Sequence, residues 1–100
     1  YKLFKQPFPL EIIEIGSLEK FEILPDVEAV AVKTPHTDES QAICLRDKNN
    51  KTLVYTADMG MTKVLGSVAR NADLFVCECS FVKNKPTEKH LELAEAMHLA

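Results

Sequence analysis

The pattern of apolar and polar positions changes once along the chain, near Asp58. Before this point, short runs rich in β-branched and apolar residues are separated by turn signals, as in strands joined into hairpins. Strands are predicted at 10–15, 19–24, 27–34, 42–46 and 52–57. The polar stretch between the last two is expected to form a turn.

After Asp58 the apolar positions follow a helical period. One face of the first predicted helix is formed by Val64, Leu65, Val68 and Ala69. Asn71 is expected to end this helix. Residues 73–79 then form a near-continuous apolar run of strand length, which indicates a buried strand.

A second helix is predicted at the end of the chain. Thr87 is expected to be its N-cap, with Glu88 in the first turn. Its apolar face is expected to contain Leu93, Ala94, Met97 and Ala100. The predicted order βββββαβα indicates an α/β (α+β) fold, with mostly antiparallel strands followed by βα units.

Composition narrows the class of protein without identifying a function. The chain has 100 residues, 46% of them hydrophobic and 27% charged, which is typical of one globular domain. The net charge of −3 gives no general attraction for nucleic acid or an anionic membrane. Three cysteines do not suit a disulfide framework, so a reducing, cytoplasmic location is predicted.

Both ends of the sequence suggest a piece of a longer protein. The chain begins with Tyr1 and ends at Ala100, inside the last predicted helix. No internal repeat or linker divides it, so residues 1–100 are expected to form a single segment of one domain.

Four polar residues lie where predicted elements meet loops: His36, Asp58, Glu78 and His90. Histidine and carboxylate side chains are common zinc ligands, and a carboxylate can bridge two metal ions. Each also has an ordinary structural explanation, such as a solvated histidine, a helix cap, a polar strand end or a histidine at the edge of the core. Composition and spacing therefore indicate only an α/β domain with a candidate site.

Longer motifs add a family resemblance. Thr-Pro-His-Thr-Asp-Glu-Ser at 34–40, followed by Leu-Val-Tyr-Thr-Ala-Asp at 53–58, resembles the third and fourth metal-binding motifs of the metallo-β-lactamase superfamily. Residues 71–81, followed by His90-Leu91 and Ala94, look like the phosphodiesterase and RNase Z-like branch. The match runs in order from about Val27 to Ala100.

The resemblance implies a role for each candidate residue. His36 would be a metal ligand, and Asp58 would bridge two metal ions. Glu78 would orient His90, which would donate a proton to the leaving group or bind the scissile phosphate. Two zinc ions are expected in the full-length protein, with manganese or iron as alternatives.

The resemblance also implies that the domain is incomplete. Residues 1–100 would form the C-terminal half of an αββα sandwich, without the His-x-His-x-Asp-His half and the last ligand histidine. The fragment alone is expected to be inactive. Two residues depart from the family pattern, since Ala57 replaces a glycine and Met59 replaces a threonine.

The predicted function is that of a metal-dependent hydrolase, which uses a metal-activated water to cleave a phosphodiester or related ester. The alternative is a non-catalytic binding or assembly module derived from the same fold. The expected partner is a small-molecule or phosphodiester substrate. Nucleic acid is a possible partner that the charge does not support, and a homo-oligomer is compatible with the sequence. An RNA-processing nuclease would need a basic patch that this segment lacks, and no membrane partner is expected.

Overall fold

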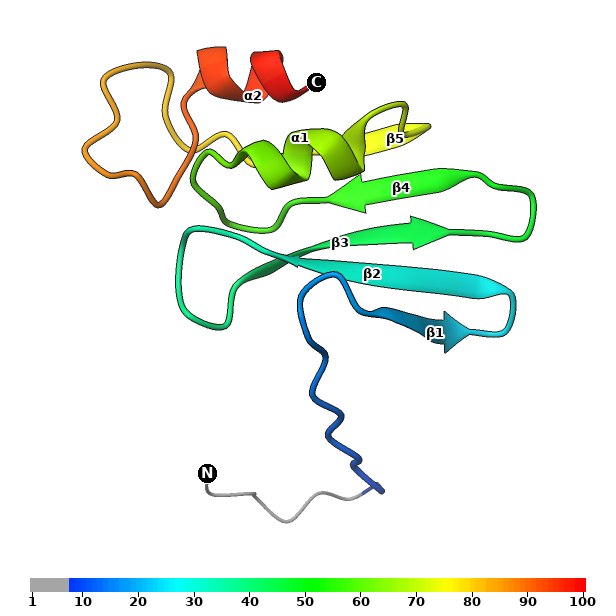
Figure 1. The fold of residues 1–100 in the computed structure, drawn as a ribbon. Coiled ribbons are helices and arrows are strands. Elements are labelled where there is room, and N and C mark those ends of the chain that lie inside the picture. The colour runs from blue at the N-terminus through cyan, green and yellow to red at the C-terminus, as the bar shows by residue number, and fades with distance from the viewer. Residues whose placement is uncertain (1–7) are drawn as a thin grey trace.

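The computed structural model describes residues 8–100, which form one five-stranded sheet with two helices (Figure 1). The elements, in chain order, are β1 (Lys20–Leu24), β2 (Val27–Lys33), β3 (Gln41–Arg46), β4 (Thr52–Tyr55), α1 (Lys63–Ala69), β5 (Leu74–Val76) and α2 (Leu93–Leu99). The strands lie side by side in the same order as in the sequence. The mixed α/β class is therefore confirmed. None of the helices in the described part of the chain is both long enough and apolar enough to span a membrane.

Strand direction determines where the loops gather. β1 to β4 pair antiparallel, and β5 pairs parallel to β4 after the crossover through α1. As a result β2, β4 and β5 run in the same direction, and their C-terminal ends meet at one edge of the sheet, on the left in Figure 1. The tight turns β1–β2 and β3–β4 lie at the opposite edge. A rigid sheet with loops at one edge is a common support for a functional site.

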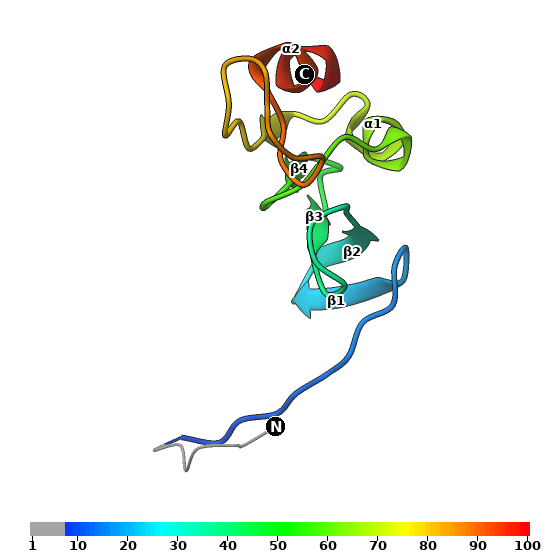
Figure 2. The ribbon, with the colours of Figure 1, turned by 90° about the vertical axis from the view of Figure 1, so that its left-hand side faces the viewer.

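One face of the sheet packs against the helices. Val54 of β4 is in register with Cys44 of β3 and with Phe75 of β5, so these side chains point to the same face. The core on this face also contains Val32, Ala42, Met59, Leu65, Ala69, Leu91, Ala96 and Leu99. The two helices touch, since a Cβ added to Gly66 would lie 3.8 Å from Leu99 Cδ2. Figure 2 shows α1 beside the sheet and α2 beyond β4.

The opposite face is apolar but open near β4 and β5. Tyr55 pairs with Val76, and Leu53 pairs with Leu74, so these four side chains share this face. Tyr55 is 48% exposed, Leu74 53% and Val76 42%. Residues 8–100 therefore provide a cover for one side of the sheet and leave apolar surface on the other.

One strand prediction was wrong, and a second was wrong in part. Residues 10–15 form no strand, and Ile12 and Ile13 are more than half exposed. High β-propensity does not produce a strand without a hydrogen-bonding partner, and within the described chain β1 pairs with β2 only. The run 73–79 forms a strand only at Leu74–Val76, and its second face is exposed rather than buried.

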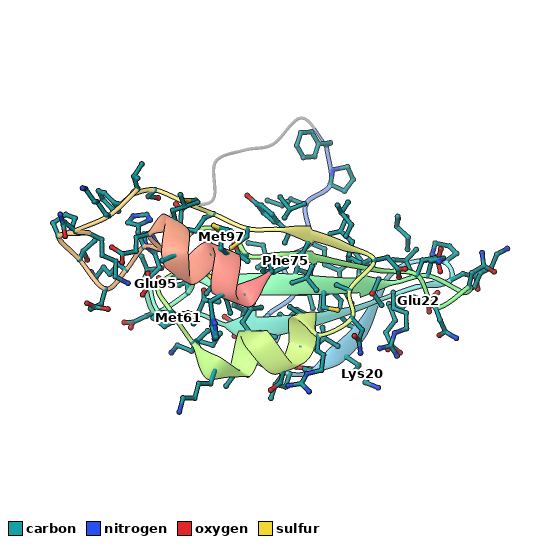
Figure 3. The ribbon with its side chains drawn as sticks, turned by 90° about the horizontal axis from the view of Figure 1, so that it is seen from above. Lys20, Glu22, Met61, Phe75, Glu95 and Met97 are labelled. Carbon is teal, nitrogen blue, oxygen red and sulfur yellow. The ribbon has the colours of Figure 1, made fainter. Side chains whose placement is uncertain are left out.

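The start and the buried face of α2 also differ from the prediction. The N-cap is Glu92 rather than Thr87, because the side chains of Glu92 and Glu95 form a reciprocal capping box. The Thr87 hydroxyl instead accepts a hydrogen bond from the Lys89 amide within the loop. The face of α2 that packs on the core contains Ala96 and Leu99, whereas Met97, predicted on the apolar face, is 67% exposed (Figure 3).

The helix α1 allows a matched test of core packing. Leu65 is fully buried, whereas Val64, predicted on the same apolar face, is 48% exposed. Leu65→Ala should lower the free energy of unfolding by about 2–5 kcal/mol, because it leaves a cavity under the sheet. Val64→Ala should change it by about 0.5 kcal/mol or less. Denaturant unfolding measures both values, and equal losses would contradict this packing.

The open sheet face predicts association of the isolated chain. Contiguous exposed apolar side chains favour contacts between molecules, so light scattering should detect species larger than a monomer. The double substitution Leu74→Lys and Val76→Lys should shift the population toward monomer. Val82→Lys, which changes an exposed loop residue, serves as the control and should leave the distribution unchanged. A wild-type chain that stays monomeric at high concentration would contradict this prediction.

Candidate metal and acid–base site

The four predicted site residues lie together at the edge where β2, β4 and β5 end. His36 follows β2, Asp58 follows β4, Glu78 follows β5, and His90 lies shortly before α2. The ring centroids of His36 and His90 are 4.8 Å apart, with an angle of 66° between the ring planes. Strand direction thus brings together side chains that are far apart in the sequence.

His36 and Asp58 form one half of the site. Nδ1 of His36 lies 3.0 Å from the Lys89 carbonyl oxygen, which can only accept, so Nδ1 is the ring nitrogen that carries hydrogen. Nε2 then keeps its lone pair and lies 3.9 Å from Oδ2 of Asp58. Asp58 does not cap α1, whose N-cap is Thr62. The Asp58 side chain is 68% exposed and is free to turn.

These two residues fit part of a metal site. The 3.9 Å separation is too long for a hydrogen bond. Two ligands of one tetrahedral zinc ion lie about 3.4 Å apart, which a small rotation of the exposed Asp58 carboxylate would reach. A catalytic zinc ion takes three protein ligands, so a complete site needs at least one donor in addition to this pair.

Glu78 forms the centre of the other half. Its side chain is 8% exposed and accepts five hydrogen bonds. The donors are the amides of Met59, Ser80 and Leu91, the Ser80 hydroxyl and Nδ1 of His90, at 2.7–3.2 Å. Burial alone would raise the pKa of Glu78, but these hydrogen bonds outweigh it and lower the pKa to about 2. The carboxylate is therefore ionised at neutral pH.

The arrangement distinguishes orienting groups from metal ligands. Asp58, Glu78 and His90 could each offer one ligand atom, and these atoms lie within 4.8 Å of one another. A carboxylate has about four lone-pair positions, and five donors already compete for those of Glu78. Glu78 is thus suited to hold His90 rather than to bind an ion. His36, Asp58 and Nε2 of His90 are the donors whose lone pairs are not already used in a hydrogen bond to the protein.

His90 is held by one ring nitrogen. Nδ1 donates to Oε1 of Glu78 at 2.7 Å, which leaves Nε2 available for a proton or a substrate. The Ser80 hydroxyl also lies 3.1 Å from Nδ1. Because Ser80 and Glu78 contact the same nitrogen, these residues do not form a Ser-His-acid triad, in which the serine and the acid contact opposite nitrogens. Ser80 was not among the residues predicted from the sequence, because its contacts with Glu78 and His90 depend on the path of the loop after β5.

Backbone features hold the loops in place. Ala57 has a φ of 52°, in the left-handed region that favours glycine, and it lies at the position where the family motif has glycine. The Gly60 amide donates to the Pro35 carbonyl at 2.6 Å, and a Cβ on Gly60 would collide with the Glu88 carbonyl. The loops after β2, β4 and β5 are therefore packed tightly against each other at this point.

The lowered pKa of Glu78 predicts a pH dependence of stability. A depressed pKa in the folded state stabilises the fold above the ordinary pKa of 4.5, and this contribution is lost as pH falls toward about 2. Glu78→Gln should lower the free energy of unfolding at neutral pH by on the order of 3 kcal/mol. The difference from wild type should shrink between pH 4.5 and about 2, as measured by denaturant unfolding.

A matched control for this experiment is Glu39→Gln, a change in the exposed loop after β2. It should give the same stability as wild type at each pH. A Glu78→Gln effect that stays constant from neutral pH to pH 2 would show that the charge on Glu78 is not the cause.

Comparison of the chain with known proteins identifies its fold. No family model matches the chain. The uncharacterized protein ML1173 of Mycobacterium leprae (strain TN) is 36% identical over 63 residues, which are 61% of this chain and 22% of the relative. The metallo-β-lactamase fold protein YhfI from Bacillus subtilis is 24% identical with a TM-score of 0.76, over 88% of this chain and 36% of that chain.

The Zn²⁺-bound PqqB from Methylobacterium extorquens is a second similar structure. It is 20% identical with a TM-score of 0.58, and the match covers 79% of this chain and 31% of that chain. The chain therefore spans about a third of each similar structure and less of the curated relative. The sheet, its helices and the order of its strands have the architecture of part of the metallo-β-lactamase fold.

Proposed function

We propose that the chain is part of a metal-dependent hydrolase that cleaves a phosphodiester or a related ester with a metal-activated water. The observation that carries this proposal is the approach of two chemically different pairs at one edge of the sheet. His36 and Asp58 offer metal donors, and Glu78 and His90 form a pair suited to acid–base chemistry. The 4.8 Å between the two histidine rings lets both pairs reach one substrate. The zinc in the similar PqqB structure supports a metal in this fold.

In this proposal His36 binds the metal through Nε2 and Asp58 binds it through its carboxylate. A metal ion held there would polarise the substrate and lower the pKa of a bound water. Zinc, with two ions in the full-length protein, suits this mixture of nitrogen and oxygen donors, and manganese or iron are the alternatives.

His90 supplies the proton in this proposal. Because Glu78 is ionised at neutral pH, it holds the ring in one orientation with hydrogen on Nδ1. When the ring also carries a proton on Nε2, that proton is the one given to the leaving oxygen, and the ring returns to the neutral form with hydrogen on Nδ1. Nε2 is also the atom that would contact the scissile phosphate. The Glu78–His90 pair is also what favours the phosphodiesterase and RNase Z-like branch.

Residues 1–100 by themselves are proposed to be inactive. His36 and Asp58 are two ligands, and a catalytic zinc ion needs at least three. The segment would then act as part of a larger domain, in accord with its coverage of about a third of similar structures. The net charge of −3 gives this segment no general attraction for nucleic acid.

Substitutions in the full-length protein test the two pairs separately. His90→Ala should lower kcat for a model phosphodiester by about 10²–10⁴-fold and leave the metal content unchanged. Asp58→Asn should lower the metal content, measured by elemental analysis after dialysis, and lower activity with it. His98→Ala, an exposed change on α2, is the control and should alter neither value.

Two other results would change the assignment. Loss of metal in His90→Ala would make His90 a ligand instead of a proton donor. A wild-type protein with neither bound metal nor hydrolytic activity would instead favour the non-catalytic binding or assembly module.

A further inference from the structure

The loop that carries His90 contains three lysines, and only one of them has a side chain that is largely shielded from solvent. Lys83 and Lys89 are exposed, whereas the Lys85 side chain is 9% exposed. Surface lysines keep the ammonium group in water, so a buried lysine needs other partners for its charge. Lys85 therefore differs from its two neighbours in environment as well as in position.

The Lys85 ammonium contacts three residues, one on α2 and two in its own loop. It donates to both carboxylate oxygens of Glu95, in the first turn of α2, at 2.7 and 2.8 Å. It also lies 3.4 Å from Glu88 and donates to the backbone carbonyl of His90 at 3.2 Å. The hydrogen bond with Glu95 raises the pKa of Lys85, so the ammonium stays charged over the usual pH range. Figure 3 shows Glu95 at the end of α2 nearest this loop.

Lys85 and Glu78 both form hydrogen bonds with the peptide group between His90 and Leu91, Lys85 with its carbonyl and Glu78 with its amide. The carbonyl of His90 accepts from Lys85, and the amide of Leu91, in the same peptide unit, donates to Glu78 at 3.0 Å. Glu78 also accepts the ring hydrogen of His90 at 2.7 Å. A shift of this peptide would therefore move the ring relative to its carboxylate partner.

We infer that Lys85 is a positioning residue for His90, which fixes the backbone of His90 so that its ring reaches Glu78. The effect on activity rests on the function proposed above, but the effect on the ring is independent of it. Lys85 makes no contact with the His36–Asp58 pair within the described residues, so its loss should not change metal binding.

The test compares Lys85→Met with Lys83→Met in the full-length protein. Lys85→Met should lower kcat for a model phosphodiester by about 10-fold to 100-fold, with metal content unchanged and a smaller change in KM. Lys83→Met, an exposed change in the same loop, should match wild type. Lys85→Arg should recover part of the loss, because a guanidinium can still pair with the Glu95 carboxylate.

A double variant separates positioning from a general loss of stability. If Lys85 acts through His90, adding Lys85→Met to His90→Ala should cause no further fall in kcat. An additive fall would overturn the inference, as would loss of metal in Lys85→Met.

A spectroscopic measurement gives a readout that needs no activity. In the ¹⁵N-histidine spectrum, the Nδ1–H signal of His90, assigned by its absence in His90→Ala, should be protected from solvent exchange in wild type. It should broaden in Lys85→Met and remain in Lys83→Met. If wild type hydrolyses no substrate, the proposed function fails and this signal still decides the role of Lys85. An unchanged signal in a folded Lys85→Met or Lys85→Gln variant would overturn the inference.

Discussion

The buried carboxylate of Glu78 is the contact on which the rest of the site depends. Placing a charge in a side chain that is 8% exposed is costly unless hydrogen bonds replace the lost water. The donors come from the loop after β4, from the residues directly after β5, and from the segment before α2. Since each donor that is left unpaired also carries a penalty, these segments are held in one arrangement.

The topology of the sheet explains how the segments around Glu78 come together. The parallel crossover from β4 through α1 to β5 places the end of β5 beside the end of β4. The left-handed turn at Ala57 and the close contact at Gly60 then fit the loops around Glu78. Backbone strain of this kind is commonly found at functional sites, where the surrounding structure compensates for it.

The sequence predicted β1 to β4 well because their alternating apolar residues have partners in register. It predicted a strand at 10–15 wrongly because pairing depends on which strand lies alongside, and β-propensity does not report that. The late start of α2 also escaped prediction. A capping box with glutamate as the N-cap is a weaker signal than Thr87, and the decisive hydrogen bonds involve Glu95 within the helix.

The sequence was enough to predict which residues lie in the candidate site, but not which contacts each of them makes. Motif order indicated His36, Asp58, Glu78 and His90, and the structure brings them together. The number of donors around Glu78 and the burial of Lys85 depend on contacts across the fold. A lysine between Asn84 and Pro86 looks like any exposed loop residue in sequence. In the structure, the positions of Glu95 on α2 and of Glu88 in the loop show that its charge is paired.

The two halves of the site differ in how much of their support lies within the described chain. The Glu78–His90 half has its donors, its loop and its lysine within residues 8–100, so its geometry is set by this segment. The His36–Asp58 half has a 3.9 Å separation between its side chains and an Asp58 carboxylate that is 68% exposed, so its geometry is held less firmly. The side chains of the two halves share no hydrogen bond among the described residues, although the Lys89 carbonyl that accepts from Nδ1 of His36 directly precedes His90. In the function proposed above, side-chain substitutions in the two halves can therefore be told apart by experiment if the backbone from Lys89 to His90 is unchanged.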